Sequence, residues 1–221
     1  MTRQNSQSGS IGFCCKMETE NGTMKTVIIT SSHVLNKKEK VYMNIEGESV
    51  EVGNCIYSPN EGAMNIPSLV DIAVVEINEN NENNFHTKVM DKEREKQDFQ
   101  ISEKECDQYT QVWKHGATSG LTTGIVTSPK FEICMKNGTR FVSIIEGQSK
   151  PFSDPGDSGA SVLFQENEGI FALSLIVGQG SPDKHPPDES SKRNCFTAIL
   201  NSAIQRFESE RKAKLHITSP K

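Results

Sequence analysis

The sequence lacks long apolar runs, and it lacks an excess of positive charge. No stretch approaches the roughly 18 consecutive apolar residues that a membrane-spanning helix requires, which argues against an integral membrane protein. Lys and Arg total 24 against 29 Asp and Glu, so the formal net charge is −5. Because nucleic-acid-binding domains carry clustered basic residues, we expect neither a membrane nor a nucleic-acid partner.

A secretory signal is also missing. Residues 1–10 are polar, without the apolar segment and the small-residue cleavage site of a signal peptide. The sequence therefore predicts a cytoplasmic protein, unless it is a segment excised from a longer precursor. Polar terminal residues with nothing to bury usually stay disordered, and we expect this of residues 1–10.

Cysteine is present, but not in the spacing of a metal site. The sequence has no C-x-x-C pair, and no His/Cys cluster with the spacing of zinc ligands. An even number of cysteines would allow three disulfides, but reduced thiols are the expected state in a chain without a secretory signal. We therefore predict no metal, no other cofactor and six free cysteines, which are Cys14, Cys15, Cys55, Cys106, Cys134 and Cys195.

The sequence does contain a succession of short segments rich in β-forming residues, separated by glycine and polar turn residues. Asn21-Gly22 and Asn137-Gly138 lie between such segments, and Asn-Gly tolerates the positive φ angles of a two-residue hairpin turn. Strands at this spacing predict an all-β sandwich or barrel. The candidate strands cover residues 11–17, 24–30, 41–45, 50–57, 72–77, 110–114, 124–127, 131–136, 140–145, 161–164, 170–177 and 195–199.

Charge and periodicity divide the chain. Residues 91–109 are dominated by charged side chains, which predicts a solvated linker, with a short exposed helix at residues 92–96 as the alternative. We place a first β-unit at residues 10–90 and a second at residues 110–214. The second unit is expected to end in a helix capped by Asn201 or Ser202, with Ile204 and Phe207 packed on that unit and a loose end after it.

Three short stretches carry groups suited to nucleophilic catalysis. His33 follows an apolar strand, Asp71 precedes one, and Ser158 lies among glycines before another. A serine hydroxyl is a weak nucleophile until a neighbouring base accepts its proton, and a neutral imidazole is suited to that role near neutral pH. A buried carboxylate then holds the imidazole in the required tautomer. We therefore predict a catalytic triad of these three residues.

The glycines around Ser158 indicate a second feature. The oxyanion formed during acyl transfer needs two N–H donors aimed at one point, and glycine allows the backbone to turn tightly enough to supply them. The backbone amides of Gly156 and Ser158 are the predicted donors.

These stretches resemble the signatures of the trypsin/chymotrypsin-like serine peptidase family. They read Thr30-Ser31-Ser32-His33, Asp71-Ile72-Ala73-Val74 and Gly156-Asp157-Ser158-Gly159-Ala160. The family signatures are T-A-A-H, D-I-A-L and G-D-S-G-G, in the same order. Residues 116–126 also resemble the G-x-T-T-G stretch of α-lytic-type bacterial members. No single motif is specific, but three in this order, each beside a strand, make a strong resemblance.

The resemblance implies two antiparallel six-stranded β-barrels, with His33 and Asp71 in the first, Ser158 in the second and the active site in the cleft between them. It implies a serine endopeptidase that hydrolyses a protein or peptide substrate through an acyl-enzyme. The alternative is a self-processing domain, or a non-catalytic protease-like binding domain, of a larger regulatory protein. No cysteine follows His33, where secreted members usually have one, which is typical of an intracellular member.

The chain departs from the family pattern at the residue before the nucleophile. Many members pair the aspartate of G-D-S-G with an N-terminus freed by cleavage, but no basic residue precedes Ile11 here. Asp157 therefore needs another partner, and the candidates are Lys114, His115 and Arg140. Without a partner the oxyanion loop would be poorly ordered, and activity would need a trigger.

The specificity pocket is the second departure. The family places its pocket base six residues before the nucleophile, which is Phe152 here, and the opposite wall on the strand that contains Ser174 and Val177. No acidic residue occupies the base, although Asp154 lies close by. We therefore expect a substrate with a modest or apolar P1 side chain rather than Lys or Arg.

Overall fold

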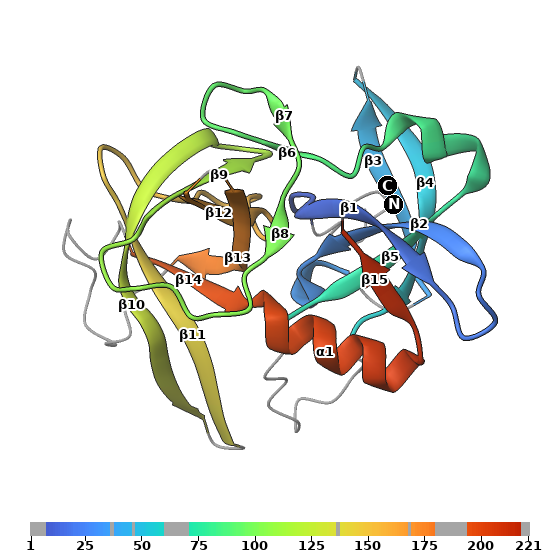
Figure 1. Ribbon diagram of the computed structural model, residues 1–221. Helices are drawn as coiled ribbons and strands as arrows, with labels where there is room; N and C mark the ends of the chain where they lie inside the picture. Colours follow the sequence, from blue (N-terminus) through green and yellow to red (C-terminus); the bar gives the residue numbers. More distant parts are fainter. Residues whose placement is uncertain are drawn as a thin grey trace, which may run out of the picture.

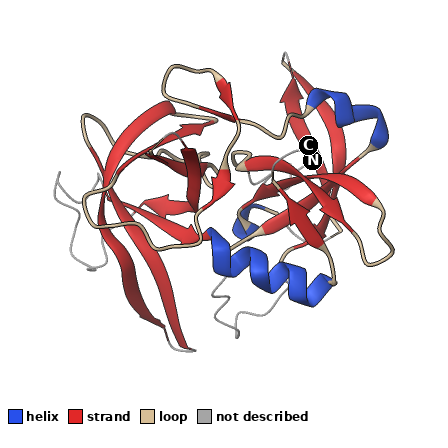
Figure 2. Cartoon of the chain, viewed as in Figure 1, coloured by secondary structure: helices blue, strands red, loops and turns tan. Residues whose placement is uncertain are grey.

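The computed structural model describes residues 8–35, 38–45, 47–59, 71–135, 138–167, 169–179 and 194–217. Two β-sheets lie side by side, and helix α1 (Leu200–Arg211) lies against both of them (Figure 1). Strands account for most of the regular structure, as Figure 2 shows. Short 3₁₀ helices are found at η1 (Ser32–Val34) and η2 (Glu79–Asn84).

The first sheet has six strands in the order β15-β1-β2-β5-β4-β3, and all neighbours are antiparallel. Its strands are β1 (Phe13–Glu18), β2 (Met24–Thr30), β3 (Lys40–Ile45), β4 (Glu48–Tyr57), β5 (Ala73–Ile77) and β15 (Lys214–His216). Strand β15 is a difference from the sequence prediction, which left this segment as a loose end. It pairs with β1, with Leu215 opposite Met17. Three residues with one apolar side chain are too short a pattern to indicate a strand.

The second sheet closes into a barrel, because β12 pairs with both β13 and β9. Its strands are β9 (Gln111–Gly116), β10 (Gly120–Met135), β11 (Gly138–Gly147), β12 (Ser161–Glu166), β13 (Gly169–Gln179) and β14 (Asn194–Ile199). The predicted all-β architecture in two parts with a C-terminal helix is therefore confirmed. The described strands of the first part form an open six-stranded sheet.

The charged segment 91–109 is more structured than a bare linker. It contains β7 (Lys96–Gln97), which pairs with β6 (Val89–Met90), and β8 (Gln100–Ile101), which runs parallel to β13. Phe99, which lies between β7 and β8 in the chain, is buried and contacts Phe13 edge-to-face, with ring centroids 5.2 Å apart. Phe99 and the pairing of β8 with β13 thus hold this charged segment against the body of the protein, and Ser102 and Cys106 are buried in it as well.

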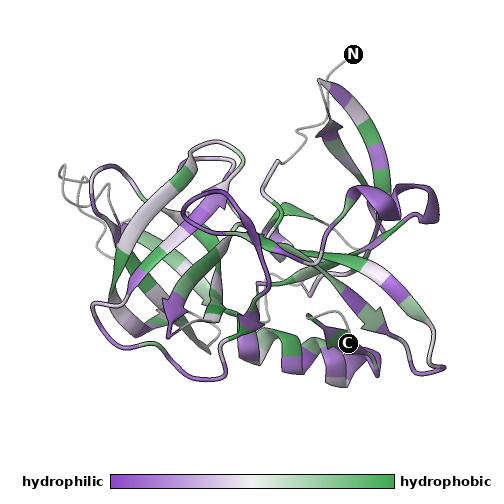
Figure 3. Cartoon of the chain, turned by 45° about the horizontal axis from the view of Figure 1, so that its top comes forward, coloured by the Kyte–Doolittle hydropathy of each residue, from purple (hydrophilic) through white to green (hydrophobic). Residues whose placement is uncertain are grey.

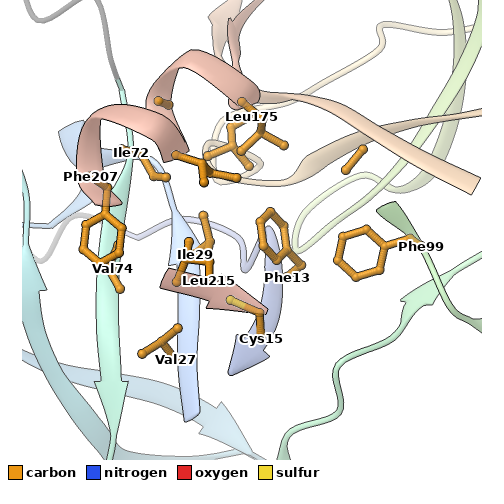
Figure 4. Close-up of a cluster of buried hydrophobic side chains, with 14 of the residues drawn as sticks. Phe13, Cys15, Val27, Ile29, Ile72, Val74, Phe99, Leu175, Phe207 and Leu215 are labelled. Carbon is orange, nitrogen blue, oxygen red and sulfur yellow. The ribbon is translucent and has the colours of Figure 1, made fainter. Parts of the chain in front are cut away.

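The two parts share a hydrophobic core. Side chains alternate along β1, as in any strand, so that Phe13, Cys15 and Met17 face the shared core while Cys14 faces the other side of the first sheet. The shared core also takes in Phe99, Leu175, Phe207 and Leu215 (Figure 4). A separate cluster fills the interior of the barrel. A core of this kind fixes the first sheet against the barrel.

Helix α1 differs from the sequence prediction in its start and in its packing. It begins at Leu200 after Ile199, which makes no side-chain capping bond, so neither Asn201 nor Ser202 is the N-cap. Hydrophobic and hydrophilic residues alternate along it (Figure 3), and its apolar face buries Phe207. That ring packs edge-to-face on Tyr57 of β4, 5.1 Å between centroids, and so lies on the first sheet rather than only on the barrel.

We expect Phe207→Ala to lower the free energy of unfolding by about 3–5 kcal/mol, because it removes a fully buried ring from the shared core. Urea unfolding monitored by circular dichroism measures the change. Phe141→Ala, the same substitution at a side chain that is 39% exposed, is the control and should cost well under 1 kcal/mol. Equal losses in the two variants would contradict a shared core held by α1.

The two predicted Asn-Gly hairpin turns have different outcomes. The hairpin between β1 and β2 has a five-residue loop, residues 19–23, rather than a two-residue turn, because Glu18 pairs with Met24. Gly22 takes the positive φ of +77° within it. Asn137 lies outside the described residues, although Met135 pairs with Gly138 across that hairpin.

The five cysteines whose side chains are described are buried and form no disulfide, as predicted; the Cys134 side chain lies outside the described residues. In the described part of the chain, no helix is long and apolar enough to span a membrane.

Candidate active site

His33 and Asp71 come together because the end of β2 and the start of β5 lie side by side in the first sheet. β2 pairs antiparallel with β5, with Thr30 opposite Ala73. His33 follows β2 in the 3₁₀ turn η1, and Asp71 immediately precedes β5. The Nδ1 atom of His33 lies 2.6 Å from Oδ2 of Asp71. The side chain of His33 is 37% exposed and that of Asp71 is 1% exposed, so the imidazole can reach a ligand while its carboxylate partner cannot.

The carboxylate of Asp71 accepts two further hydrogen bonds. Its Oδ1 accepts from the backbone N–H of His33 at 3.0 Å and from Oγ of Ser32 at 2.7 Å. Burial raises the pKa of Asp71, but the hydrogen bonds from His33 and Ser32 lower it by more, so the pKa lies below its usual value. The ionised carboxylate therefore keeps the proton of His33 on Nδ1 and leaves Nε2 free to act as a base.

Ser158 lies in a loop before β12, here called the nucleophile loop (residues 154–160). It lines a cavity of about 390 Å³ together with His33 and Gly156. Its Oγ donates to the carbonyl of Val177 at 3.4 Å, and the described residues include no hydrogen bond between Ser158 and His33. The structure therefore brings the three predicted triad residues to one place, with the serine hydroxyl bonded to the carbonyl of Val177 and not to His33.

The hydrogen bonds of the nucleophile loop fix its peptide groups. Each carbonyl from residue 154 to residue 158 accepts a hydrogen bond. The donors, in chain order, are Asp157 N (2.9 Å), Thr118 Oγ1 (2.9 Å), Ser10 Oγ (3.0 Å), Ala160 N (3.0 Å) and Ser10 N (2.7 Å). The N–H groups of this loop then show which donors remain for a ligand.

Two amides of the loop are left over. Residue 155 is proline, and the N–H groups of Asp154, Asp157, Gly159 and Ala160 all donate to acceptors. Within the described part of the chain, the N–H groups of Gly156 and Ser158 have no acceptor. These are the two donors predicted for the oxyanion, and both residues line the cavity that His33 enters.

Lys114 is the partner of Asp157. Its Nζ lies 2.9 Å from Oδ2 of Asp157, and both side chains are fully buried. The structure thus selects Lys114 from the three candidates: His115 contacts the carbonyl of Asp91 instead, and the side chain of Arg140 lies outside the described residues. Lys114 comes from β9, at the start of the barrel.

The carboxylate of Asp157 accepts hydrogen bonds from five donors. Besides Lys114, these are Oγ of Ser119 (2.5 Å) and the backbone amides of Thr118 (2.9 Å), Ser119 (3.2 Å) and Asp154 (2.9 Å). Burial raises the pKa of Asp157, but the bonds from Ser119, Lys114 and the amides lower it to about 2. Burial lowers the pKa of Lys114 by more than Asp157 raises it. The carboxylate therefore ties the nucleophile loop to the β9–β10 turn (residues 117–119).

The prediction of disorder for the first ten residues is wrong for Ser10. Ser10 is 6% exposed, and its N–H donates to the carbonyl of Ser158. Its Oγ accepts from the N–H of Ala117 at 2.8 Å, and its carbonyl accepts from Oγ1 of Thr30 at 2.8 Å. The sequence of this polar segment predicts disorder, because three of its partners, Ala117, Gly156 and Ser158, lie more than a hundred residues away in the chain.

Two of the three expected pocket residues are buried side chains. Phe152 and Ser174 are both fully buried, Phe152 within the cluster that fills the barrel. The structure therefore does not bring either side chain to the surface of the cavity that holds His33 and Ser158. Val177 lies next to Ser158, with its carbonyl accepting from the serine hydroxyl.

Comparison with known proteins gives structural matches only. No protein-family model matches the sequence, and no curated protein matches it. The structure is similar to Thermobifida fusca Protease A (TM-score 0.61, 18% identity, covering 94% of this chain and 90% of that chain). It is also similar to Cellulomonas bogoriensis chymotrypsin (TM-score 0.59, 18%, covering 96% and 92%) and to alpha-lytic protease homolog N4 (TM-score 0.60, 16%, covering 94% and 91%).

The chain therefore has the fold of chymotrypsin-like serine proteases over nearly its whole length. At these identities the likeness concerns the fold, and the chemistry has to be argued from the residues of this chain.

Proposed function

We propose that this protein is a serine endopeptidase in which Ser158, His33 and Asp71 hydrolyse peptide bonds through an acyl-enzyme. The observation that carries the proposal is the pair of unbonded amides at Gly156 and Ser158, in the same cavity as a histidine held by a buried carboxylate. Both N–H groups belong to half-buried residues that line this cavity, so they are accessible to a ligand there, and a developing oxyanion is a ligand that would use them.

The first half of the reaction forms the acyl-enzyme. Oγ of Ser158 attacks the carbonyl carbon of the peptide bond while its proton passes to Nε2 of His33. The carbonyl oxygen becomes an oxyanion that accepts hydrogen bonds from the amides of Gly156 and Ser158. When the C–N bond breaks, the same proton passes from His33 to the leaving amine, so the new amine end is neutral as it departs.

The second half repeats these steps with water. His33 accepts a proton from a water molecule, whose oxygen attacks the ester carbon, and the same two amides hold the second oxyanion. The C–O bond to Ser158 then breaks, and the proton on His33 returns to Oγ. Asp71 stabilises the charged imidazole in both halves and is not itself protonated.

The serine hydroxyl has to change partner for this chemistry. Its bond to the carbonyl of Val177 is long, 3.4 Å, and therefore weak. Catalytic hydrogen bonds are often absent or poorly aligned before substrate binds. Rotation about the Cα–Cβ bond of Ser158 on substrate binding would break this bond and direct Oγ toward His33.

The same hydroxyl orientation favours a second candidate function. A protease-like domain used for binding, or one that awaits a trigger, would keep Ser158 away from His33. In the binding-only case the serine has no enhanced reactivity toward an electrophile. Reactivity of Ser158 therefore separates the two candidates.

The test is intact-mass spectrometry after treatment with a fluorophosphonate. In an active site, Oγ of Ser158 forms a bond to phosphorus, fluoride leaves, and His33 takes the proton. We expect one adduct on the wild-type protein and none on Ser158→Ala, with Ser161→Ala as a matched control that keeps the adduct. Ser161 is a serine of the neighbouring strand β12, and it lies outside the proposed machinery. Absence of the adduct on folded wild-type protein would overturn the proposed endopeptidase.

A further inference from the structure

Two hydroxyl groups outside the triad contact the peptide groups on either side of Gly156. Oγ1 of Thr118 donates to the carbonyl of Pro155 at 2.9 Å, and Oγ of Ser10 donates to the carbonyl of Gly156 at 3.0 Å. Thr118 belongs to the β9–β10 turn of the barrel, and Ser10 to the segment that leads into the first sheet. Hydroxyl groups from the barrel and from the segment before the first sheet therefore both bond to peptide groups of Gly156.

The bond from Thr118 sets the direction of a predicted oxyanion donor. In a trans peptide the C=O and N–H groups point to opposite sides, and the described residues contain no cis peptide bond. The carbonyl of Pro155 and the N–H of Gly156 belong to one peptide group. Holding that carbonyl toward Thr118 therefore holds the N–H of Gly156 on the side away from Thr118.

This peptide group has little else to fix it. The N–H of Gly156 has no acceptor in the described part of the chain, and the φ of Gly156 is +103°, in the region open mainly to glycine. A Cβ atom at residue 156 would clash with Oγ1 of Thr118, so a side chain there would displace the hydroxyl. Glycine allows the contact, but its freedom also allows the peptide to rotate once the contact is lost.

The two hydroxyls are themselves held in place. The N–H of Thr118 donates to the carboxylate of Asp157, and Oγ of Ser10 accepts from the N–H of Ala117. Ser10 also donates its own N–H to the carbonyl of Ser158. The β9–β10 turn, the Ser10 segment and the nucleophile loop therefore form one hydrogen-bonded unit around Gly156.

We infer that Thr118 is a positioning residue that orients the Gly156 amide as an oxyanion donor, and that Ser10 supports it by fixing the following peptide group, between Gly156 and Asp157. The inference rests on the proposed function for its consequence, since an oriented donor matters only where an oxyanion forms. Neither hydroxyl touches the reacting atoms. Each acts by fixing a carbonyl, and through it the peptide plane beside Gly156.

The experiment compares Thr118→Val, which removes the hydroxyl at nearly constant volume, with Thr118→Ser, which keeps it. Thr118 is exposed, so neither change disturbs the core. We expect Thr118→Val to slow fluorophosphonate modification of Ser158 about tenfold, below the 10²–10³ loss that follows removal of a whole oxyanion donor. Thr118→Ser should restore the rate, and Thr118→Val combined with Ser10→Ala should slow it further.

Thr110→Val is the matched control. Oγ1 of Thr110 also donates to a backbone carbonyl, that of Asp107 at 2.7 Å, but on an exposed turn away from the cavity. Its rate should equal that of the wild type. The pH dependence of the rate should keep its shape in all variants, because His33 and Asp71 are untouched; a changed profile would place the effect on the base and overturn the inference.

The ¹⁵N–¹H resonance of Gly156 gives a readout that needs no reaction. We expect it to shift or broaden in Thr118→Val and to stay in place in Thr118→Ser and Thr110→Val. An unmoved resonance in Thr118→Val, or an unchanged rate, would overturn the inference while leaving the proposed peptidase intact. An unreactive wild type would overturn the peptidase, and the resonance would still decide whether Thr118 orients this amide.

Discussion

Replacing Lys114 by Met should lower the free energy of unfolding by about 3–5 kcal/mol, the usual cost of leaving one member of a buried ion pair without its partner. Both side chains of the Lys114–Asp157 pair are fully buried, so water cannot compensate the remaining carboxylate. The nucleophile loop should loosen as well, because Asp157 joins it to the β9–β10 turn. We therefore expect slower fluorophosphonate modification of Ser158 together with lower stability, measured by urea unfolding.

The matched control for this change is Lys130→Met. Lys130 and Glu105 form a pair of nearly the same length, 2.8 Å, but both side chains are about half exposed. Exposed pairs contribute little, about 0–1 kcal/mol, so this variant should unfold almost as the wild type does. A loss in Lys114→Met no larger than that in Lys130→Met would show that the buried pair does not hold the loop.

The effect of Lys114→Met should also depend on pH. The pKa of Asp157 lies at about 2 in the folded protein, below its ordinary value of 3.8. A carboxyl whose pKa is lowered by folding stabilises the folded state fully above its unfolded pKa and loses that contribution as pH falls through the folded pKa. The stability difference between wild type and Lys114→Met should therefore shrink between about pH 4 and pH 2.

Asp71→Asn should reduce the rate of reaction at Ser158 on the order of 10⁴-fold while leaving the fold intact. The Asn carbonyl oxygen would keep the bonds from Ser32 and the His33 amide, since these are donors. Its NH₂ group would then face Nδ1 of His33, which has to become an acceptor. The ring proton would move to Nε2, and His33 could no longer take the proton of Ser158.

The measurement is the rate of fluorophosphonate modification, with circular dichroism to show that the variant is folded. Asp91→Asn serves as the control, because Asp91 is an aspartate that accepts hydrogen bonds from Glu95 and Gln97 far from the cavity. Its rate should equal that of the wild type. A rate for Asp71→Asn within tenfold of the wild type would mean that the tautomer of His33 is not controlled by Asp71.

The candidate site could be proposed from the sequence, because its parts depend on local context. Each predicted triad residue lies next to a segment whose β-forming residues predict a strand. Glycine indicates the tight loop around the serine. The two predicted oxyanion donors, Gly156 and Ser158, are the amides left without acceptors in that loop. The family resemblance supplied the order in which these pieces combine.

The residues that hold the site in place could not be predicted, because their roles depend on contacts between segments that are distant in the chain. Lys114 lies in β9 beside His115, and a charged residue in a strand gives no local sign that it points into a barrel rather than outward. Ser10 and Thr118 carry ordinary hydroxyls in polar stretches, and their acceptors become apparent only when the loop is folded. The burial of Phe152 and Ser174 is equally a property of the closed barrel.

The pairing of β15 with β1 has a consequence for biosynthesis. β15 follows the whole second barrel in the chain, yet it forms the edge of the first sheet, with Leu215 opposite Met17. During translation, the first five strands of that sheet therefore emerge from the ribosome long before the sixth is synthesised. Until then, the edge of β1 stays unpaired. Contacts of such high sequence separation slow folding, so the first sheet is completed only after translation has passed α1.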